Sequence, residues 1–141
     1  EKTFGRETAA TTKGFVMEFI HAPKACASVG PYSHCVKAGS TYYLCGQVPF
    51  HPVTGEVVGN GMKEQAVQTL ANMKAVLEAA GLAVTDIAKT TVFVTNMDDF
   101  AAFNEVYAAF MGEHRPARVC VEVSNIAHGC LLEMDAICFK E

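Results

Sequence analysis

Residues 62–94 read MKEQAVQTLANMKAVLEAAGLAVTDIAKTTVFV, and the hydrophobic period changes within this stretch. Up to residue 80, apolar side chains recur at steps of three and four, at Ala66, Leu70, Met73, Leu77 and Ala80. This spacing predicts an amphipathic helix over residues 62–80, with Gly81 as its stop. From residue 87 the β-branched and aromatic side chains of TTVFV predict a strand that ends at residue 94.

The flanking segments predict further strands and a second helix. We expect strands at residues 33–37, 41–48, 118–123 and 131–139, and a brief strand at 56–58. Gly39-Ser40 suits a tight hairpin turn between the first two. Asp98 or Asp99 is expected to cap a helix that ends near Gly112. This order predicts an α+β fold, in which a mixed β-sheet has two helices packed on one face.

The face of the predicted sheet opposite the helices also carries apolar side chains that have to be buried. The strands carry apolar residues on both sides, as Val92, Phe93 and Val94 illustrate. The two predicted helices cover one face, and the pattern predicts no third helix for the other. Oligomerisation through the sheet is therefore the simplest expectation.

Length and charge narrow the class of protein. The chain has 141 residues, which predicts one domain. We expect residues 1–16 to be an extended N-terminal extension that packs little, and residues 17–141 to form the domain. The net charge is −4 and the 11 basic residues are scattered, which argues against nucleic-acid and membrane-surface binding. We expect a cytoplasmic location.

The six cysteines form no C-x-x-C pair and match no zinc-ligand spacing. We interpret them as mostly reduced core side chains. The five histidines show no metal-binding arrangement either, so no metal is expected. Cys120 could act as a nucleophile, but no histidine is spaced as an obvious base for it, so covalent catalysis is not expected.

Arg118 and Glu133 are the two charges in the last predicted strands that we interpret as functional, whereas Glu122 and Asp135 are expected to be solvated or interface charges. A charge within a sheet costs several kcal/mol unless it is paired or meets a ligand. An arginine fork fits a carboxylate, and a nearby glutamate can hold or deprotonate water. Expecting their strands to be neighbours, we predict that the pair binds an amino-acid-like substrate and delivers water to it. The alternative is a structural ion pair at a strand edge or subunit interface.

Two more residues are candidates for the same site. Tyr32 follows the Gly30-Pro31 turn and could form an aromatic wall, or be a half-buried turn residue. Asn104 on the second helix could be a hydrogen-bonding anchor, or merely a polar residue on the exposed face of that helix.

From about residue 22 to its end, the chain resembles the RidA family, the YjgF/YER057c/UK114 group. The resemblance rests on separate motifs in the family's order: GPYS at 30–33, GQVP at 46–49, PVTGE at 52–56, KTTVFV at 89–94, PARVCVEV at 116–123 and EMDA at 133–136. The sequence departs from the family pattern at Cys45, where serine is usual, and at His34, where glutamine is common. Residues 112–115 form a shorter loop, and IAHG at 126–129 replaces a Leu-Pro turn.

The resemblance implies a chorismate-mutase-like subunit that forms a homotrimer with sites between subunits. It implies hydrolysis of 2-imino or 2-enamino acids, such as 2-aminoacrylate or 2-iminobutanoate, to 2-keto acids and ammonia, without metal or organic cofactor. Arg118 would bind the substrate carboxylate and Glu133 would orient the attacking water. The residues expected to contact substrate are Tyr32, Cys45, Gly46, Asn104, Arg118 and Cys120.

Three other functions stay open at this point. The first is a non-catalytic regulatory trimer that binds 2-keto acids through the same Arg118. The second is an endoribonuclease or translation inhibitor, against which the acidic balance weighs. The third is a chaperone-like role, for which the sequence offers no support. The family has cytosolic and mitochondrial members, so the resemblance leaves the compartment open between the two.

Overall fold

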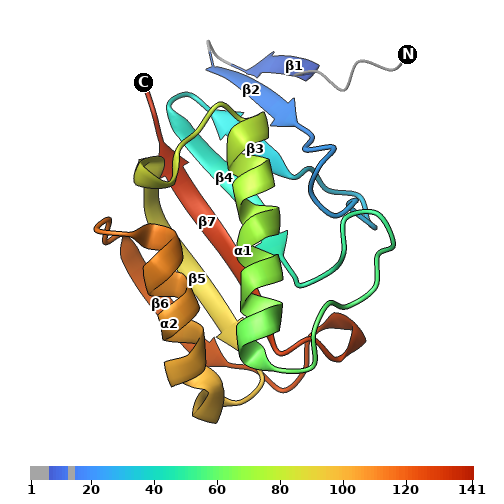
Figure 1. Ribbon diagram of the computed structural model, residues 1–141. Helices are drawn as coiled ribbons and strands as arrows, with labels where there is room; N and C mark the ends of the chain where they lie inside the picture. The colour runs from blue at the N-terminus through green and yellow to red at the C-terminus, as the bar shows by residue number, and fades with distance from the viewer. Residues whose placement is uncertain (1–6, 13–14) are drawn as a thin grey trace.

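The computed structural model describes residues 7–12 and 15–141, and in these residues seven strands form one sheet (Figure 1). The sheet order is β1-β2-β3-β4-β7-β5-β6, and the only parallel pair in this described sheet is β5 with β6. The expected mixed sheet is therefore confirmed. The strands are β1 (Glu7–Thr12), β2 (Phe15–Ile20), β3 (Cys35–Ala38), β4 (Thr41–Gln47), β5 (Ile87–Val94), β6 (Ala117–Glu122) and β7 (Leu132–Phe139).

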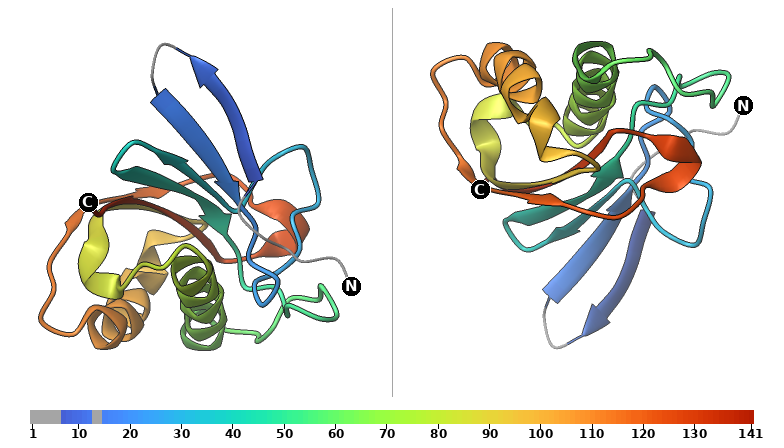
Figure 2. Two further views of the ribbon diagram at one scale, coloured as in Figure 1. Left: turned by 90° about the horizontal axis from the view of Figure 1, so that it is seen from above. Right: turned by 90° about the horizontal axis from the view of Figure 1, so that it is seen from below.

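Two helices, α1 (Met62–Ala79) and α2 (Phe100–Met111), pack side by side on one face of the sheet, as Figure 2 shows. All five residues of the predicted stripe on α1 are buried, which confirms both the helix and its inward face. Gly81 has φ +74°, and its N–H donates to the carbonyl of Glu78. The left-handed conformation ends α1 at the predicted place.

The start of α2 differs from the prediction. Asp99 occupies the N-cap position of α2, but its side chain makes no capping hydrogen bond; instead, the side chain of Asn96 accepts a hydrogen bond from the N–H of Asp98 at 2.9 Å. That bond caps a short 3-10 turn, Met97–Asp99, which leads into α2. Asparagine side chains readily bond the main-chain N–H two residues ahead, so the capping side chain lies two or three positions before the expected Asp98 or Asp99. The C-terminal end is as predicted, because Gly112 terminates α2 with φ +62°.

The strands β6 and β7 are not neighbours, contrary to the expectation. β5 lies between them, pairing with β6 in parallel and with β7 antiparallel. A parallel pair needs a crossover connection, and α2 supplies it between β5 and β6. The brief strand expected at residues 56–58 is also reduced, to a single bridge between Phe50 and Val57.

Side chains alternate along the strands as the sequence predicts. On β7, Leu132, Met134, Ala136 and Cys138 are buried under the helices, whereas Glu133 and Asp135 point to the other side. We call this other side, which α1 and α2 do not cover, the open face. Several of its apolar side chains are exposed, and these form the open-face patch: Tyr43, Val119, Val121 and Phe139.

The N-terminal segment contributes more structure than expected. β1 pairs with β2, and β2 pairs with β3, so both strands continue the sheet beyond β3. The sequence pattern indicated neither strand. The boundary expected between residues 16 and 17 falls inside β2, and the division into an extension and a domain stays a prediction. The rest of the extension, residues 1–6 and 13–14, lies outside the described residues.

None of the helices in the described residues has the combination of length and apolar character needed to cross a bilayer. All six cysteines are free thiols, of which Cys35, Cys130 and Cys138 are buried.

Candidate functional site

Arg118 lies on β6 and points to the helix-covered face, beneath α2. Its Nη1 donates to Oδ1 of Asn104 at 2.8 Å. Its guanidinium carbon lies 5.3 Å from the ring centre of Phe100 and 4.8 Å from that of Tyr107. One amide and two aromatic faces therefore hold the cation in place while leaving other N–H donors for a ligand. Asn104 therefore faces Arg118 from α2, and its contact with a substrate stays a prediction.

Tyr107 is held from behind by a buried hydrogen bond. Its hydroxyl and the Thr90 hydroxyl lie 2.8 Å apart, on the helix-covered side of β5. Asn104, Tyr107 and Ala108 are spaced at i, i+3 and i+4, so α2 presents all three on one side. The bond fixes the ring against which Arg118 stacks.

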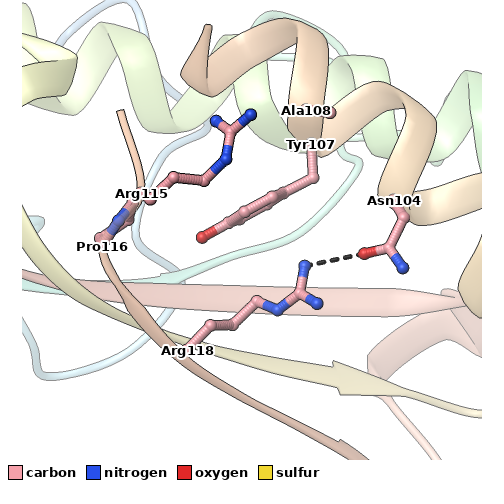
Figure 3. A pocket seen from close by; sticks show the side chains of 6 residues that line it. All are labelled: Asn104, Tyr107, Ala108, Arg115, Pro116 and Arg118. Carbon is pink, nitrogen blue, oxygen red and sulfur yellow. Dashed lines mark hydrogen bonds between the residues drawn. The ribbon is translucent and has the colours of Figure 1, made fainter. Parts of the chain in front are cut away.

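A cavity of about 460 Å³ opens in front of these side chains (Figure 3). Its volume is in the range of small-molecule sites. Arg115 and Arg118 both belong to its wall, and two guanidinium groups are chemically suited to an anion. The residues that line it are Asn104, Tyr107, Ala108, Arg115, Pro116 and Arg118.

Cys120 follows Arg118 on the same side of β6 and packs against the core. Burial raises the pKa of its thiol, and the nearby charge of Arg118 acts in the opposite direction without cancelling the shift. The thiol is therefore protonated at neutral pH, which does not favour a nucleophilic role. β6 has a strand neighbour on one side within the described sheet, so part of its backbone faces away from the sheet and is open to a ligand.

Glu133 belongs to a second group of residues, on the open face. An irregularity in the β4–β7 pairing lies between Leu44 and Gln47, and it contains Cys45 and Gly46. A Cβ added at Gly46 would lie 2.7 Å from Oε1 of Glu133. The carboxylate therefore lies directly against the backbone of Gly46, and a larger residue there would displace the Glu133 side chain.

The electrostatics of this second group favour protonated side chains. Burial, and then the charge of Asp135, raise the pKa of Glu133 above its ordinary value of 4.5. Burial also raises the pKa of Cys45 to about 11, although a hydrogen bond from Gln47 to its sulfur acts against the shift. Glu133 is thus suited to accept a proton, and Cys45 is a neutral thiol at pH 7.

Within one chain, the two groups lie on opposite faces of the sheet. Arg118 shares a row with Thr90 and Ala136 on the helix-covered face. Glu133 shares a row with Phe93 and Val121 on the open face. A pleated sheet separates the two side chains, so an ion pair between them inside one chain is excluded.

Tyr32 lies apart from both groups in the loop between β2 and β3. Its ring packs beside Gly30, and the side chain is 48% exposed. An exposed aromatic residue is consistent with a wall that faces another molecule, but in one chain it does not line the cavity with Arg118.

Four residues of the cavity wall were not identified as site residues from the sequence: Tyr107, Ala108, Arg115 and Pro116. Tyr107 was assigned to the apolar stripe of α2, and Arg115 to a shortened loop. The i, i+3 spacing from Asn104 could have indicated Tyr107. No sequence signal places Arg115 beside Arg118, because the turn between them has no regular period. Among the described residues, no three His, Cys, Asp or Glu side chains group as metal ligands.

Comparison with known proteins gives consistent matches over most of the chain. The family model for endoribonuclease L-PSP matches residues 21–140. A RutC family protein of Pyrococcus horikoshii is 48% identical over 124 residues, which are 88% of this chain and 98% of that protein. The 2-iminobutanoate/2-iminopropanoate deaminase of Escherichia coli is 45% identical over 124 residues, or 86% and 96% of the two chains.

Solved structures also match most of the chain. TdcF of Escherichia coli, solved with bound serine, matches with a TM-score of 0.82 and 41% identity over 87% of this chain and 98% of that one. The YjgF gene product of Escherichia coli matches with a TM-score of 0.82 and 44% identity, over 87% and 98%.

Proposed function

Because the chain belongs to the RidA family, described by the model for endoribonuclease L-PSP, we propose that it hydrolyses 2-imino and 2-enamino acids to 2-keto acids and ammonia. The observation that carries the proposal is Arg118, fixed by Asn104 and Tyr107 in the wall of a cavity of small-molecule size. A relative at 45% identity is named for this reaction.

Substrate binding follows from the geometry of Arg118. A 2-imino acid carries a carboxylate beside the reacting carbon, and a guanidinium binds it through two parallel N–H donors. Anchoring that carboxylate orients the C=N bond and presents its carbon to water. The serine bound to TdcF has the same 2-amino carboxylate pattern, which supports a ligand of this class.

Glu133 is the proposed proton acceptor. A 2-enamino acid first takes a proton at its β-carbon and becomes the imine. The imine reacts as its N-protonated iminium: water adds to the carbon, gives one proton to Glu133, and leaves a hydroxyl and an amino group on that carbon. Glu133 returns the proton to the nitrogen, the C–N bond breaks with its electron pair on nitrogen, ammonia leaves, and the hydroxyl loses its proton to solvent to form the keto group. The raised pKa of Glu133 suits this role near neutral pH.

The site requires more than one copy of the chain. Since Arg118 and Glu133 lie on opposite faces in one chain, we propose that each site combines Arg118 from one subunit with Glu133 and Tyr32 from another. The uncovered apolar open face supports assembly of this kind. A homotrimer of chorismate-mutase-like subunits, as the resemblance implies, satisfies both requirements.

The test uses two inactive variants that complement each other. Imino acids are generated in the cuvette by an amino-acid oxidase, and keto-acid formation is followed. Arg118→Ala should lower kcat/KM about 100-fold, because a charged bidentate contact is lost. Arg118→Lys keeps the charge without the fork and should fall between that variant and the wild type. Thermal unfolding of each variant checks the fold.

Glu133→Gln should also be inactive, but trimers assembled from mixed Arg118→Ala and Glu133→Gln chains should recover activity. Random mixing makes about one quarter of intersubunit sites complete. No recovery would contradict the intersubunit site. If the wild type binds 2-keto acids but accelerates no hydrolysis, the non-catalytic regulatory trimer replaces the enzyme.

The ribonuclease alternative has weaker support. The family description names that activity, but the chain has a net charge of −4. The cavity offers two arginines rather than a basic groove that follows a nucleic-acid backbone. The complementation assay with RNA in place of imino acid would detect the activity directly.

A further inference from the structure

Arg115 is held in a rigid turn between α2 and β6. The His114 N–H donates to Met111 O at 3.1 Å, and the His114 Nε2 lies 2.7 Å from Ile87 O on β5. Nη1 of Arg115 then donates to the carbonyls of Gly112 and His114. The turn is therefore pinned to the sheet, and the side chain of Arg115 is pinned to the turn.

The guanidinium of Arg115, on the cavity wall, keeps N–H donors that no carbonyl occupies. An arginine has five N–H groups, and the two carbonyl bonds both use Nη1. Those partners are uncharged main-chain oxygens, so they leave the positive charge of Arg115 uncompensated. Figure 3 shows this side chain on the cavity wall, with the Tyr107 ring between it and Arg118.

Because Arg115 and Arg118 are both cationic, their cavity favours a ligand that carries two negative charges. A single carboxylate on Arg118 neutralises one guanidinium and leaves Arg115 beside an occupied site. A ligand with a second carboxylate neutralises both, and each charged hydrogen bond adds more than a neutral one would. The volume of about 460 Å³ leaves room beyond the reacting part of a small imino acid.

We propose that Arg115 binds a side-chain carboxylate of the substrate, so that this protein prefers 2-imino and 2-enamino dicarboxylic acids. Arg118 binds the carboxylate next to the reacting carbon, and Arg115 binds the one at the far end. This assignment rests on the proposed hydrolysis, and it deepens that function by naming the substrate class. Arg115 is thus a specificity residue.

The test compares two product-like ligands of equal carbon-chain length, 2-ketoglutarate and 2-ketovalerate, which differ by the second carboxylate. Calorimetric titration of the assembled wild-type protein should show 2-ketoglutarate binding about tenfold more tightly. Arg115→Gln should reduce that ratio to near one. Arg115→Lys retains a cation and should keep part of it. Raising the salt concentration should also shrink the ratio for the wild type.

Equal binding of both ligands by the wild type would overturn the proposal, and so would an unchanged ratio in Arg115→Gln. If Arg115→Gln does not fold, Arg115→Lys and the salt series still decide. Inorganic phosphate serves as a further probe, and phosphate that competes as well as 2-ketoglutarate would assign the site to anions in general and also overturn the dicarboxylate preference.

Failure of the proposed hydrolysis gives a different result. Absent turnover with a preserved preference for 2-ketoglutarate would contradict the enzyme and leave the dicarboxylate site standing. Turnover of imino acids without any preference would contradict the dicarboxylate site alone.

Discussion

His34 illustrates how one residue can replace another of different chemistry. It is buried in the segment between β2 and β3, where its Nδ1 accepts from the N–H of Ala22 at 2.9 Å. Its Nε2 lies 2.8 Å from the carbonyl of Cys26, and because a carbonyl only accepts, this nitrogen carries the proton. A glutamine side chain offers the same pair, an oxygen that accepts and a nitrogen that donates.

His34→Gln should therefore keep the stability of the wild type, whereas His34→Ala should lower the free energy of unfolding by about 2 kcal/mol, because two buried main-chain groups lose their partners. Urea unfolding of the two variants side by side measures the difference. An equal loss in both would show that ring packing, and not hydrogen bonding, is what the site requires.

At Glu133 the surroundings change the proton affinity of a side chain. The fold raises the pKa of this carboxyl, first by burial and then through Asp135. A carboxyl with a raised pKa in the folded state favours its protonated form there, so stability falls as pH rises from 4.5 through the raised pKa. Glu133→Gln removes this unfavourable charge and is expected to fold.

If Glu133 must be ionised to accept a proton from water, activity falls at acid pH with a midpoint above 4.5. Asp135→Asn removes a negative neighbour, lowers the pKa of Glu133, and should move the midpoint to lower pH. The kcat profile between acid and neutral pH measures both midpoints. A midpoint that does not move in Asp135→Asn would contradict the role of Glu133 as the titrating group.

At the scale of elements, α1 does more than cover the sheet. Asn72, which is buried, donates from Nδ2 to the carbonyls of Val48 and Phe50, both at 2.9 Å, and accepts from Gln68 at 3.0 Å. These bonds tie the segment after β4 to the helix. One turn away, the buried hydroxyl of Thr69 has no hydrogen-bond partner.

Two substitutions on α1 should therefore have opposite signs. Thr69→Val keeps the shape and removes an unsatisfied hydroxyl, so it should stabilise the fold by about 1 kcal/mol. Asn72→Leu leaves two buried carbonyls without donors and should destabilise the fold by about 2 kcal/mol or more. Thermal or urea unfolding gives both values. Destabilisation by Thr69→Val would mean that its hydroxyl is solvated or bonded in solution.

At the scale of the whole molecule, the open-face patch is the feature that a single chain leaves unexplained. Val119 is 44% and Val121 40% exposed on β6, and Tyr43 on β4 and Phe139 on β7 are exposed on the same face of the sheet. Exposed apolar side chains that share one face of a regular sheet are typical of an interface between subunits. The proposed trimer buries this patch.

Val121→Asp should convert the assembly to monomers without unfolding it, because the side chain is already exposed in one chain. Val53→Asp is the matched control: Val53 is 86% exposed in a loop and should leave the assembly intact. Light scattering after size-exclusion chromatography gives the mass of each. Hydrolysis should disappear with the assembly, and a monomeric Val121→Asp protein that keeps full activity would contradict the intersubunit site.

The sequence by itself determined what depends on local periodicity. The stripe from Ala66 to Ala80 gave the helix and its buried side, and the alternation on residues 118–123 and 132–139 gave the faces of both strands. Arg118 and Glu133 were identifiable because a charge in an apolar strand is conspicuous at any register. The elements from β3 to β7 were therefore largely predictable.

Only the tertiary structure decided which elements are neighbours. The placement of β5 between β6 and β7, and of Arg118 and Glu133 on opposite faces, depends on pairing between distant segments, and no local pattern encodes it. The pairing of β1 with β2 is a second such case. Arg115 enters the site because hydrogen bonds to main-chain carbonyls fix a turn without a period. A cavity is a property of packed elements, so its wall appears only once they are in place.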